Sequence, residues 1–199
     1  MEPEVEVKFL DTDHNAVRAA LDKIGAVCQQ PMRLMRRTIF DYPDHKLQKA
    51  NWGRLRVRDE GNKITVAYKD DGLKQYSQEA ETTVESYENM CEILQAIGLI
   101  AYSYQESKRE TWIYNSVEIV LDEWPWLNPY IEIEAKTESE IRDCAEKLGF
   151  KWQQAVFGSV DNAYHHQYLG MTKDETISNV SQVRFEDPTP KWLADRQDA

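Results

Sequence analysis

The chain has 199 residues, 41% of them hydrophobic, which suits one globular domain around a single core and makes a second full domain unnecessary. It carries 35 acidic against 24 basic residues, a formal net charge of -11, and no extended basic run, so nucleic-acid or anionic-membrane binding is disfavoured. Basic residues nevertheless concentrate between Arg33 and Lys74 and again at Lys108 and Arg109, which is compatible with a local anion site.

The cysteines and the apolar stretches bear on where the protein works. Cys28, Cys91 and Cys144 stand far apart and form neither a C-x-x-C pair nor a disulfide framework, so a reducing cytosol is the simplest interpretation. The sequence shows no export signal at its start and no run of 18 apolar residues. We therefore expect a cytoplasmic protein with no membrane partner.

The first residues predict a strand followed by a helix. Charged and apolar side chains alternate over residues 4–9, which is the pattern of a strand with one charged and one apolar face. Asp11-Thr12-Asp13 then offers helix-capping side chains. The apolar positions of residues 16–24 recur with helical spacing, and Gly25 is a natural end for that helix.

The middle of the chain predicts four strands, one loop and one helix. The strands are expected over residues 32–42, 54–58, 63–69 and 78–84, with a polar loop over residues 43–51. Residues 59–62 are rich in turn formers, so the second and third of these strands should form a hairpin. An amphipathic helix is expected over residues 86–97, before Gly98.

Three more strands and two helices are expected in the second half of the chain. The strands cover residues 102–114, 116–123 and 130–135, and the prolines of residues 124–129 mark a loop between the last two. Thr137 and Glu140 form a capping-box pattern for a helix that ends at Gly149. A helix should follow from Asp161, and then a polar tail in which Pro188 and Pro190 break any regular element.

Charged side chains that share one face of a strand, which we call charged stripes, recur on several predicted strands and indicate the fold class. Side chains on a strand alternate with a period of two, so Arg54, Arg56 and Arg58 share one face, as do Glu132 and Glu134. One such stripe alone would ordinarily face solvent. Together with three helices that need an apolar sheet surface to cover, the stripes predict an α+β fold with a closed or nearly closed antiparallel barrel, apolar outside and charged inside. Burying so many charges requires a compensating anion or ion, and a polyphosphate with a metal ion fits.

The run Glu4-Val5-Glu6-Val7-Lys8 resembles the E-x-E-x-K signature that opens the CYTH superfamily, also called the triphosphate tunnel metalloenzymes. That superfamily includes thiamine triphosphatases, inorganic triphosphatases and class IV adenylyl cyclases. Further motifs follow in the order and approximate spacing of the family: Leu55-Arg56-Val57-Arg58, Thr65 with Lys69, Glu79 and Glu81, Lys108-Arg109, Leu121-Asp122 and Glu132-Ile133-Glu134. The resemblance covers roughly residues 2–170. We expect residues 1–170 to form the tunnel domain and residues 171–199 to be a C-terminal helix or tail of the same domain.

The resemblance implies roles for individual residues. Carboxylates suited to Mg²⁺ or Mn²⁺ would be Glu4, Glu6, Asp122, Glu132 and Glu134. Cations for the triphosphate would be Lys8, Arg54, Arg56, Arg58, Lys69, Lys108 and Arg109. Lys8, Arg56, Arg58 and Asp122 would take part in catalysis. The basic strand of the family commonly reads K-x-R, whereas here Ser107 occupies the lysine position and Lys108 is out of phase.

The function implied is metal-dependent hydrolysis of a triphosphate-containing small molecule, such as inorganic triphosphate, thiamine triphosphate or a nucleoside triphosphate. Two alternatives share the same charged shell: a class IV adenylyl cyclase that makes cyclic AMP and pyrophosphate, and a non-catalytic module that binds polyphosphate or nucleotide. Trp124-Pro125-Trp126 favours packing at the rim of the core over an aromatic platform for a ligand ring. Exposed sheet edges would allow a homodimer.

Overall fold

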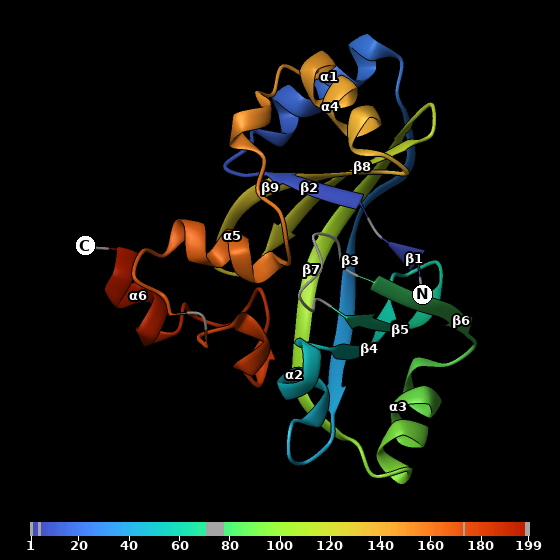
Figure 1. Ribbon diagram of the computed structural model, residues 1–199, viewed down its shortest axis with the longest axis vertical. Coiled ribbons are helices and arrows are strands. Elements are labelled where there is room, and N and C mark those ends of the chain that lie inside the picture. Colours follow the sequence, from blue (N-terminus) through green and yellow to red (C-terminus); the bar gives the residue numbers. More distant parts are fainter. Residues whose placement is uncertain (1, 4, 71–77, 173, 198–199) are drawn as a thin grey trace.

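A computed structural model describes residues 2–3, 5–70, 78–172 and 174–197 (Figure 1). Its strands form one sheet in the order β1-β6-β5-β4-β3-β7-β8-β9-β2, and β10 pairs with β7 outside this path. The strands are β1 (Glu2–Pro3), β2 (Val5–Phe9), β3 (Val27–Asp41), β4 (Arg54–Asp59), β5 (Ile64–Asp70), β6 (Gln78–Val84), β7 (Ile100–Tyr114), β8 (Val117–Trp124), β9 (Leu127–Ala135) and β10 (Gln182–Val183). Every pairing along the main path is antiparallel.

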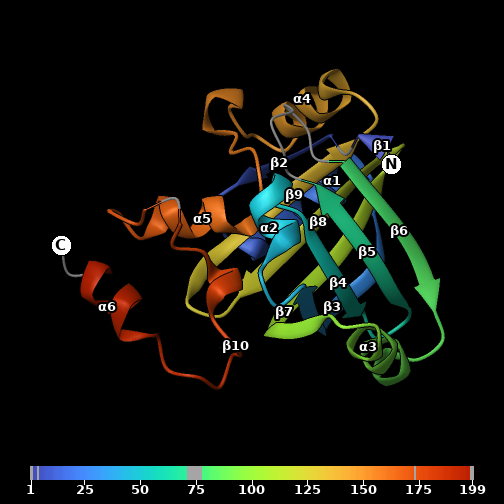
Figure 2. The same ribbon diagram turned by 60° about the horizontal axis from the view of Figure 1, so that its bottom comes forward.

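The N-terminal segment joins the two edges of the sheet. β1 pairs with β6, and β2, one residue further along the chain, pairs with β9. The sheet curls strongly as a result (Figure 2). Within the described residues no ladder joins β6 directly to β9, so the sheet is a curled, open barrel. The predicted α+β fold with an antiparallel barrel and flanking helices is confirmed, and the barrel is more open than the closed or nearly closed form that was expected.

Two long strands, β3 and β7, lie side by side in the middle of the sheet and connect its two halves. Each has 15 residues, and they pair along most of their length. β3 begins at Val27, whereas the sequence predicts its start at residue 32. Over this stretch its pairing with β7 shifts register, between Cys28 and Gln30 and again between Gln30 and Arg33. Such irregularities break the alternation of side chains that marks a strand in the sequence.

Helices cover the apolar outer face of the barrel. The helices are α1 (His14–Ile24), α2 (Lys46–Asn51), α3 (Tyr87–Ala96), α4 (Glu138–Lys147), α5 (Val160–Gln167) and α6 (Lys191–Gln197), with 3₁₀ turns η1 (Trp152–Gln154) and η2 (Ile177–Asn179). α1 and α4 lie over β2, β8 and β9 (Figure 1), where Leu21 and Ile141 pack on Val7, Ile119 and Ile133. These residues are fully buried, so the opposite face of the same strands must turn inward.

Two segments are more regular than the sequence indicates. The predicted loop over residues 43–51 contains α2, whose first amides, those of Leu47 and Gln48, donate to the carboxylate of Asp41 six and seven residues earlier. The tail contains β10 and α6, and α6 starts directly after Pro190, where a proline costs no helical hydrogen bond. The prediction of a loop was wrong over residues 46–51, and the C-terminal segment is helical after Pro190, where the prolines were expected to break regular structure.

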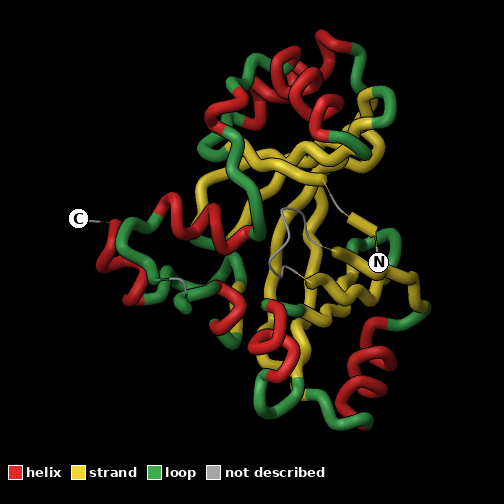
Figure 3. The backbone as a smooth tube through the Cα atoms, in the orientation of Figure 1, coloured by secondary structure: helices red, strands yellow, loops and turns green. Residues whose placement is uncertain are grey.

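The connection between β8 and β9 is shorter than predicted. β9 starts at Leu127, so only Pro125 and Trp126 remain as the turn, and Trp126 has a positive φ of 64°. Asn128 and Pro129 belong to β9. Figure 3 shows the two strands continuing almost to this turn.

Among the described residues, each helix falls short of the length and apolar character needed to cross a bilayer.

The capping box at the start of α4 gives a stability test for the barrel wall. The Thr137 hydroxyl accepts from the amide of Glu140, and the carboxylate of Glu140 accepts from the amide of Thr137 at 3.0 Å. We expect Thr137→Ala to lower the free energy of unfolding by about 1 kcal/mol, measured by urea denaturation, because an amide loses its acceptor. Thr137→Ser should lose much less. Equal losses in the two variants would contradict the capping role.

Candidate active site

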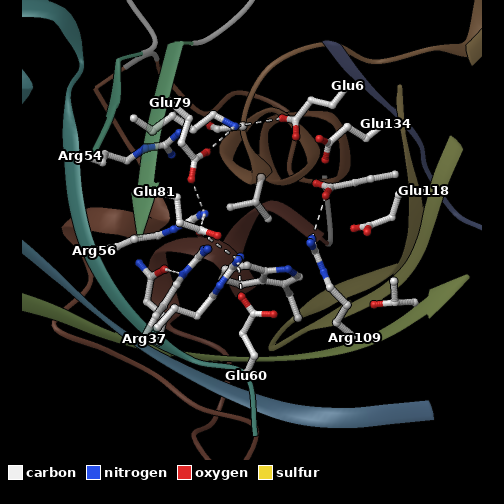
Figure 4. Close-up of a pocket in the computed structure, with 18 of the residues that line it drawn as sticks. Glu6, Arg37, Arg54, Arg56, Glu60, Glu79, Glu81, Arg109, Glu118 and Glu134 are labelled. Carbon is white, nitrogen blue, oxygen red and sulfur yellow. Dashed lines mark hydrogen bonds and ion pairs between the residues drawn. The ribbon is translucent and has the colours of Figure 1, made fainter. Parts of the chain in front are cut away.

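A cavity of about 630 Å³ lies inside the curled sheet. Alternate positions of the barrel strands line it, and Figure 4 shows Glu6, Arg54, Arg56, Arg109 and Glu134 pointing into the same space. The strands' charged faces therefore converge on one interior, while their other faces pack against helices or form apolar clusters.

Glutamates line up across β2, β9 and β8 on one wall of the cavity. The register sets Glu6 beside Glu134, and Glu134 beside Glu118. Three carboxylates on adjacent strands thus face the cavity in one row, which we call the acidic row. Glu118 was not predicted, although it shares the strand phase of Asp122, four residues later.

Lys8 lies at the centre of the acidic wall. Its side chain is 1% exposed, and its Nζ lies 3.1 Å from Glu6 Oε1 and 3.0 Å from Glu132 Oε1 and donates to the Gly158 carbonyl at 2.6 Å. Burial alone would lower the pKa of Lys8, but Glu132 and Glu6 outweigh it and raise the pKa above its ordinary value. Lys8 is therefore a permanent cation that holds neighbouring carboxylates in place.

Arg109 joins two further carboxylates. Its Nε and Nη2 donate to the two oxygens of Asp122 at 2.7 and 2.5 Å, and Nη2 also donates to Glu132 Oε2 at 2.8 Å. Burial favours the neutral form of both acids. The pKa of Asp122 stays raised despite Arg109, whereas Lys8 and Arg109 together bring the pKa of Glu132 well below its usual range. All four oxygens of these two acids therefore face cations.

β4 forms the basic wall opposite. Arg56 pairs with Glu79 at 2.9 Å, and Arg58 pairs with Glu60 at 2.6 Å. Glu81 lies 3.6 Å from Arg56 and 3.5 Å from Arg58, so the acids of β6 partly compensate the arginines. Burial, with the charge of Arg56, lowers the pKa of Arg58 to about 10.

Two more predicted cations reach the same cavity. Lys69 on β5 lies 3.4 Å from Glu6 and 4.0 Å from Glu79, so it stands between the two walls. Arg54, at the first position of β4, lies 3.9 Å from Asp161 of α5. The structure therefore brings together Lys8, Arg54, Arg56, Arg58, Lys69 and Arg109 around one space.

Arg37 on β3 is a cavity cation that the sequence did not reveal. Its Nε donates to Gln105 Oε1 at 2.9 Å, and its guanidinium lies 4.2 Å from the centre of the Trp124 ring. Among the described residues, no carboxylate lies at ion-pair distance from Arg37. Burial, and then Arg56, Arg58 and Arg54, hold its pKa well below the usual value. Arg36 and Arg37 are adjacent, so the sequence alone does not say which of them points inward.

Lys108 does not line the cavity, and that prediction was wrong. Its Nζ lies 4.6 Å from the centre of the Phe185 ring and 3.6 Å from Glu123, on the outer face of β7. Because side chains alternate along a strand, an inward Arg109 forces Lys108 outward. Glu4, one of the predicted metal ligands, lies outside the described residues.

The cavity carboxylates fit a divalent metal by ligand type. Within the described part of the chain, no three His, Cys, Asp or Glu side chains already converge closely enough to hold a metal ion. Glu6, Glu118 and Glu134 nevertheless offer hard oxygen ligands from adjacent strands, and Mg²⁺ and Mn²⁺ prefer such oxygens. Asp122 and Glu132 are less suited, since their oxygens are engaged by Arg109 and Lys8.

Comparison with known proteins adds independent findings. The family model of the CYTH domain matches residues 2–158. The PH1012 protein of Pyrococcus horikoshii OT3 is 23% identical with a TM-score of 0.63, over 77% of this chain and 94% of that one. A proposed adenylate cyclase of Vibrio parahaemolyticus is 15% identical with a TM-score of 0.71, over 79% and 95% of the two chains.

A third similar structure, from Hippeastrum, is described as a proposed adenylyl cyclase with a dominant triphosphatase activity. It is 15% identical, with a TM-score of 0.54, over 74% of this chain and 88% of that one. No curated protein matches the chain by sequence. At these identities the solved structures bear on the fold alone, whereas the family model spans most of the sequence, barrel and charged motifs included, and the chain belongs to the CYTH domain family.

Proposed function

We propose that this protein is a metal-dependent triphosphatase that hydrolyses a triphosphate-containing small molecule inside the barrel. The observation that carries the proposal is a single cavity with an acidic row, Glu6, Glu134 and Glu118, on one wall and arginines on the other. Members of the CYTH family are triphosphatases or cyclases, which supports the same class of reaction.

The basic wall would bind the phosphate oxygens. Guanidinium groups of Arg56 and Arg58 present planar pairs of N–H donors that match phosphate oxygens, while Lys69 acts as a point charge between the walls. The lowered pKa values of Arg37 and Arg58 reflect burial and mutual repulsion, which an anion would relieve. A polyanion is therefore the ligand that this wall favours.

The acidic row would hold the metal ion. Glu6, Glu118 and Glu134 would supply its carboxylate ligands, and a bound Mg²⁺ or Mn²⁺ would offset phosphate charge and orient the attacking water. Lys8 keeps Glu6 in position through its 3.1 Å contact. Asp122 positions Arg109 toward the cavity, because its two oxygens accept from that guanidinium. An acidic-row carboxylate would accept a hydrogen bond from the water as it attacks phosphorus.

A substrate panel tests the reaction. Tripolyphosphate, thiamine triphosphate and ATP are each incubated with the protein in Mg²⁺ or Mn²⁺, and the products are separated. We expect metal-dependent release of orthophosphate from at least one of them. Cyclic AMP and pyrophosphate from ATP would instead identify a class IV adenylyl cyclase. Tight binding with no product from any compound would support a non-catalytic binding module and contradict the proposal.

Replacing Arg56 tests the basic wall. Arg56→Met removes charge-assisted bonds to phosphate, so we expect the KM for the preferred triphosphate to rise about tenfold or more. Arg142→Met is the matched control, because Arg142 pairs with Glu138 on the exposed face of α4. Steady-state kinetics with a thermal melt for each variant distinguishes lost binding from lost folding. An equal KM in the two variants would remove Arg56 from the site.

Replacing Glu134 tests the acidic row. Glu134→Gln keeps the size of the side chain and removes its charge, so we expect the Mg²⁺ concentration for half-maximal turnover to rise about tenfold. Binding of the triphosphate measured in EDTA should not weaken, since a negative charge near the anion has been removed. Glu138→Gln on the outer face of α4 serves as control. Unaltered metal dependence in Glu134→Gln would exclude this glutamate as a ligand.

A further inference from the structure

Arg37 differs from the other arginines of the cavity in the partner that the protein gives it. Arg56, Arg58 and Arg109 each lie within 2.9 Å of a carboxylate oxygen. Arg37 instead donates to the neutral amide oxygen of Gln105, and across residues 5–70, 78–172 and 174–197 no acid lies at ion-pair distance from it. Figure 4 shows Arg37 pointing into the cavity from the side that carries Arg56. Its positive charge is therefore left to an anion that enters the cavity.

An unused hydrogen-bond donor lies beside Arg37. The Arg37 guanidinium lies 4.2 Å from the centre of the Trp124 ring. Trp124 lines the cavity and is only 5% exposed, and its indole Nε1 has no hydrogen-bond partner within the part of the chain that the structure describes. A buried N–H group without an acceptor is unfavourable. An anion that accepts from this indole and from the guanidinium would satisfy both groups at once.

A chain of buried hydrogen bonds orients the amide of Gln105. Ser103 Oγ donates to the Val180 carbonyl at 2.6 Å, because a carbonyl oxygen can only accept. The same Oγ therefore accepts from Gln105 Nε2, at 3.0 Å, which leaves the amide oxygen to face Arg37. Gln105 and Ser103 are 1% and 2% exposed, so water does not compete for these bonds. The position of Arg37 thus depends on a contact with Val180.

The segment after residue 158 also supports the Trp124 ring. Trp124 belongs to an apolar cluster with Ile177, Val183 and Leu193, which are all fully buried. β10 pairs with β7, and this pairing sets Val183 beside Gln105. The CYTH model matches only residues 2–158. Both partners of Arg37 are therefore held in place by a part of the chain that lies outside the family match.

We propose that Arg37 and the Trp124 indole form an additional phosphoryl-binding subsite, which the C-terminal segment positions through Ser103 and Gln105. The proposal rests on the triphosphatase function proposed above and adds residues that determine substrate binding. A phosphoryl oxygen accepts from the Arg37 guanidinium and the Trp124 N–H, beyond the oxygens held by Arg56. Gln105 is a positioning residue. A neutral amide suits this role, because a carboxylate in its place would compete with the phosphoryl group for Arg37.

Replacing Gln105 tests the neutral partner. Gln105→Glu keeps the size of the side chain and puts a negative charge against Arg37. We expect the Kd for tripolyphosphate, measured by titration calorimetry in EDTA, to rise about tenfold or more. Gln95→Glu adds the same charge on the exposed surface of α3 and should leave Kd within twofold. A thermal melt confirms that each variant is folded. The same Kd in Gln105→Glu as in the unaltered protein overturns the subsite.

Replacing the two donors tests the subsite itself. Arg37→Met should raise the Kd for tripolyphosphate about tenfold, since a charge-assisted hydrogen bond is lost. Trp124→Phe keeps an aromatic ring and removes the N–H, so we expect a rise of about fivefold. Arg142→Met, on the exposed face of α4, is the matched control for Arg37→Met. An unchanged Kd in Arg37→Met or in Trp124→Phe contradicts the proposal.

A double-mutant cycle tests the positioning by the C-terminal segment. Ser103→Ala breaks the link to Val180 without touching Arg37. We expect it to raise Kd about threefold in the unaltered protein and to have no further effect in Arg37→Met, because Ser103 acts through Arg37. An equal rise in both backgrounds overturns the positioning role, since a general loss of structure would not depend on Arg37.

These measurements keep the two proposals apart, because binding in EDTA requires neither metal nor turnover. The expected losses of affinity in a protein that releases no phosphate would support the subsite and overturn the triphosphatase. Metal-dependent release of phosphate, with an unaltered Kd in the Arg37 and Gln105 variants, would support the triphosphatase and overturn the subsite.

Discussion

Repulsion among buried arginines is the constraint on which the rest of this structure depends. Arg37, Arg54, Arg56 and Arg58 occupy neighbouring strands, and the pKa of Arg58 falls to about 10 because of burial and this crowding. The fold holds them because their strands are fixed from outside, where β4 and α3 share a buried apolar cluster. Acids on β6 offset part of the charge, whereas the partners of the Arg37 side chain among the described residues are Gln105 and the Trp124 ring. A bound polyanion would complete the compensation, and it would stabilise the folded chain as well as occupy the site.

On the opposite wall of the cavity the crowded charges are negative. Carboxylates from β2, β8 and β9 would repel each other, but Lys8 and Arg109 are inserted among them and lower the pKa of Glu132. Carboxylates thus predominate on one wall and arginines on the other, each wall carries some opposite charges, and Lys69 lies between the two. That separation gives a metal ion and a phosphate chain different places to bind within one space, which the overall charge of -11 would not suggest.

The period of two along a strand made much of the site predictable, and departures from that period account for the errors. Arg56 and Glu132 lie in unbroken strands, so their inward direction follows from the alternation. Lys108 is out of phase with Arg109 on β7, and it points outward. Arg37 follows another arginine in a strand with shifts of register, so no local pattern identifies it. The part of the cavity lined by Val160 and Ser178 depends on contacts between segments distant in sequence, which periodicity does not report.

The pairing of β2 with β9 also has a consequence for synthesis. Residue 5 pairs with residue 135, so the first strand leaves the ribosome long before its partner exists. At 5–20 residues per second, that delay lasts roughly ten seconds, during which an unpaired apolar strand is open to wrong partners. Glu6 and Glu134 meet only when this pairing forms. The acidic row is thus among the last features a nascent chain acquires, and a chaperone that shields its first residues would favour a correctly assembled barrel.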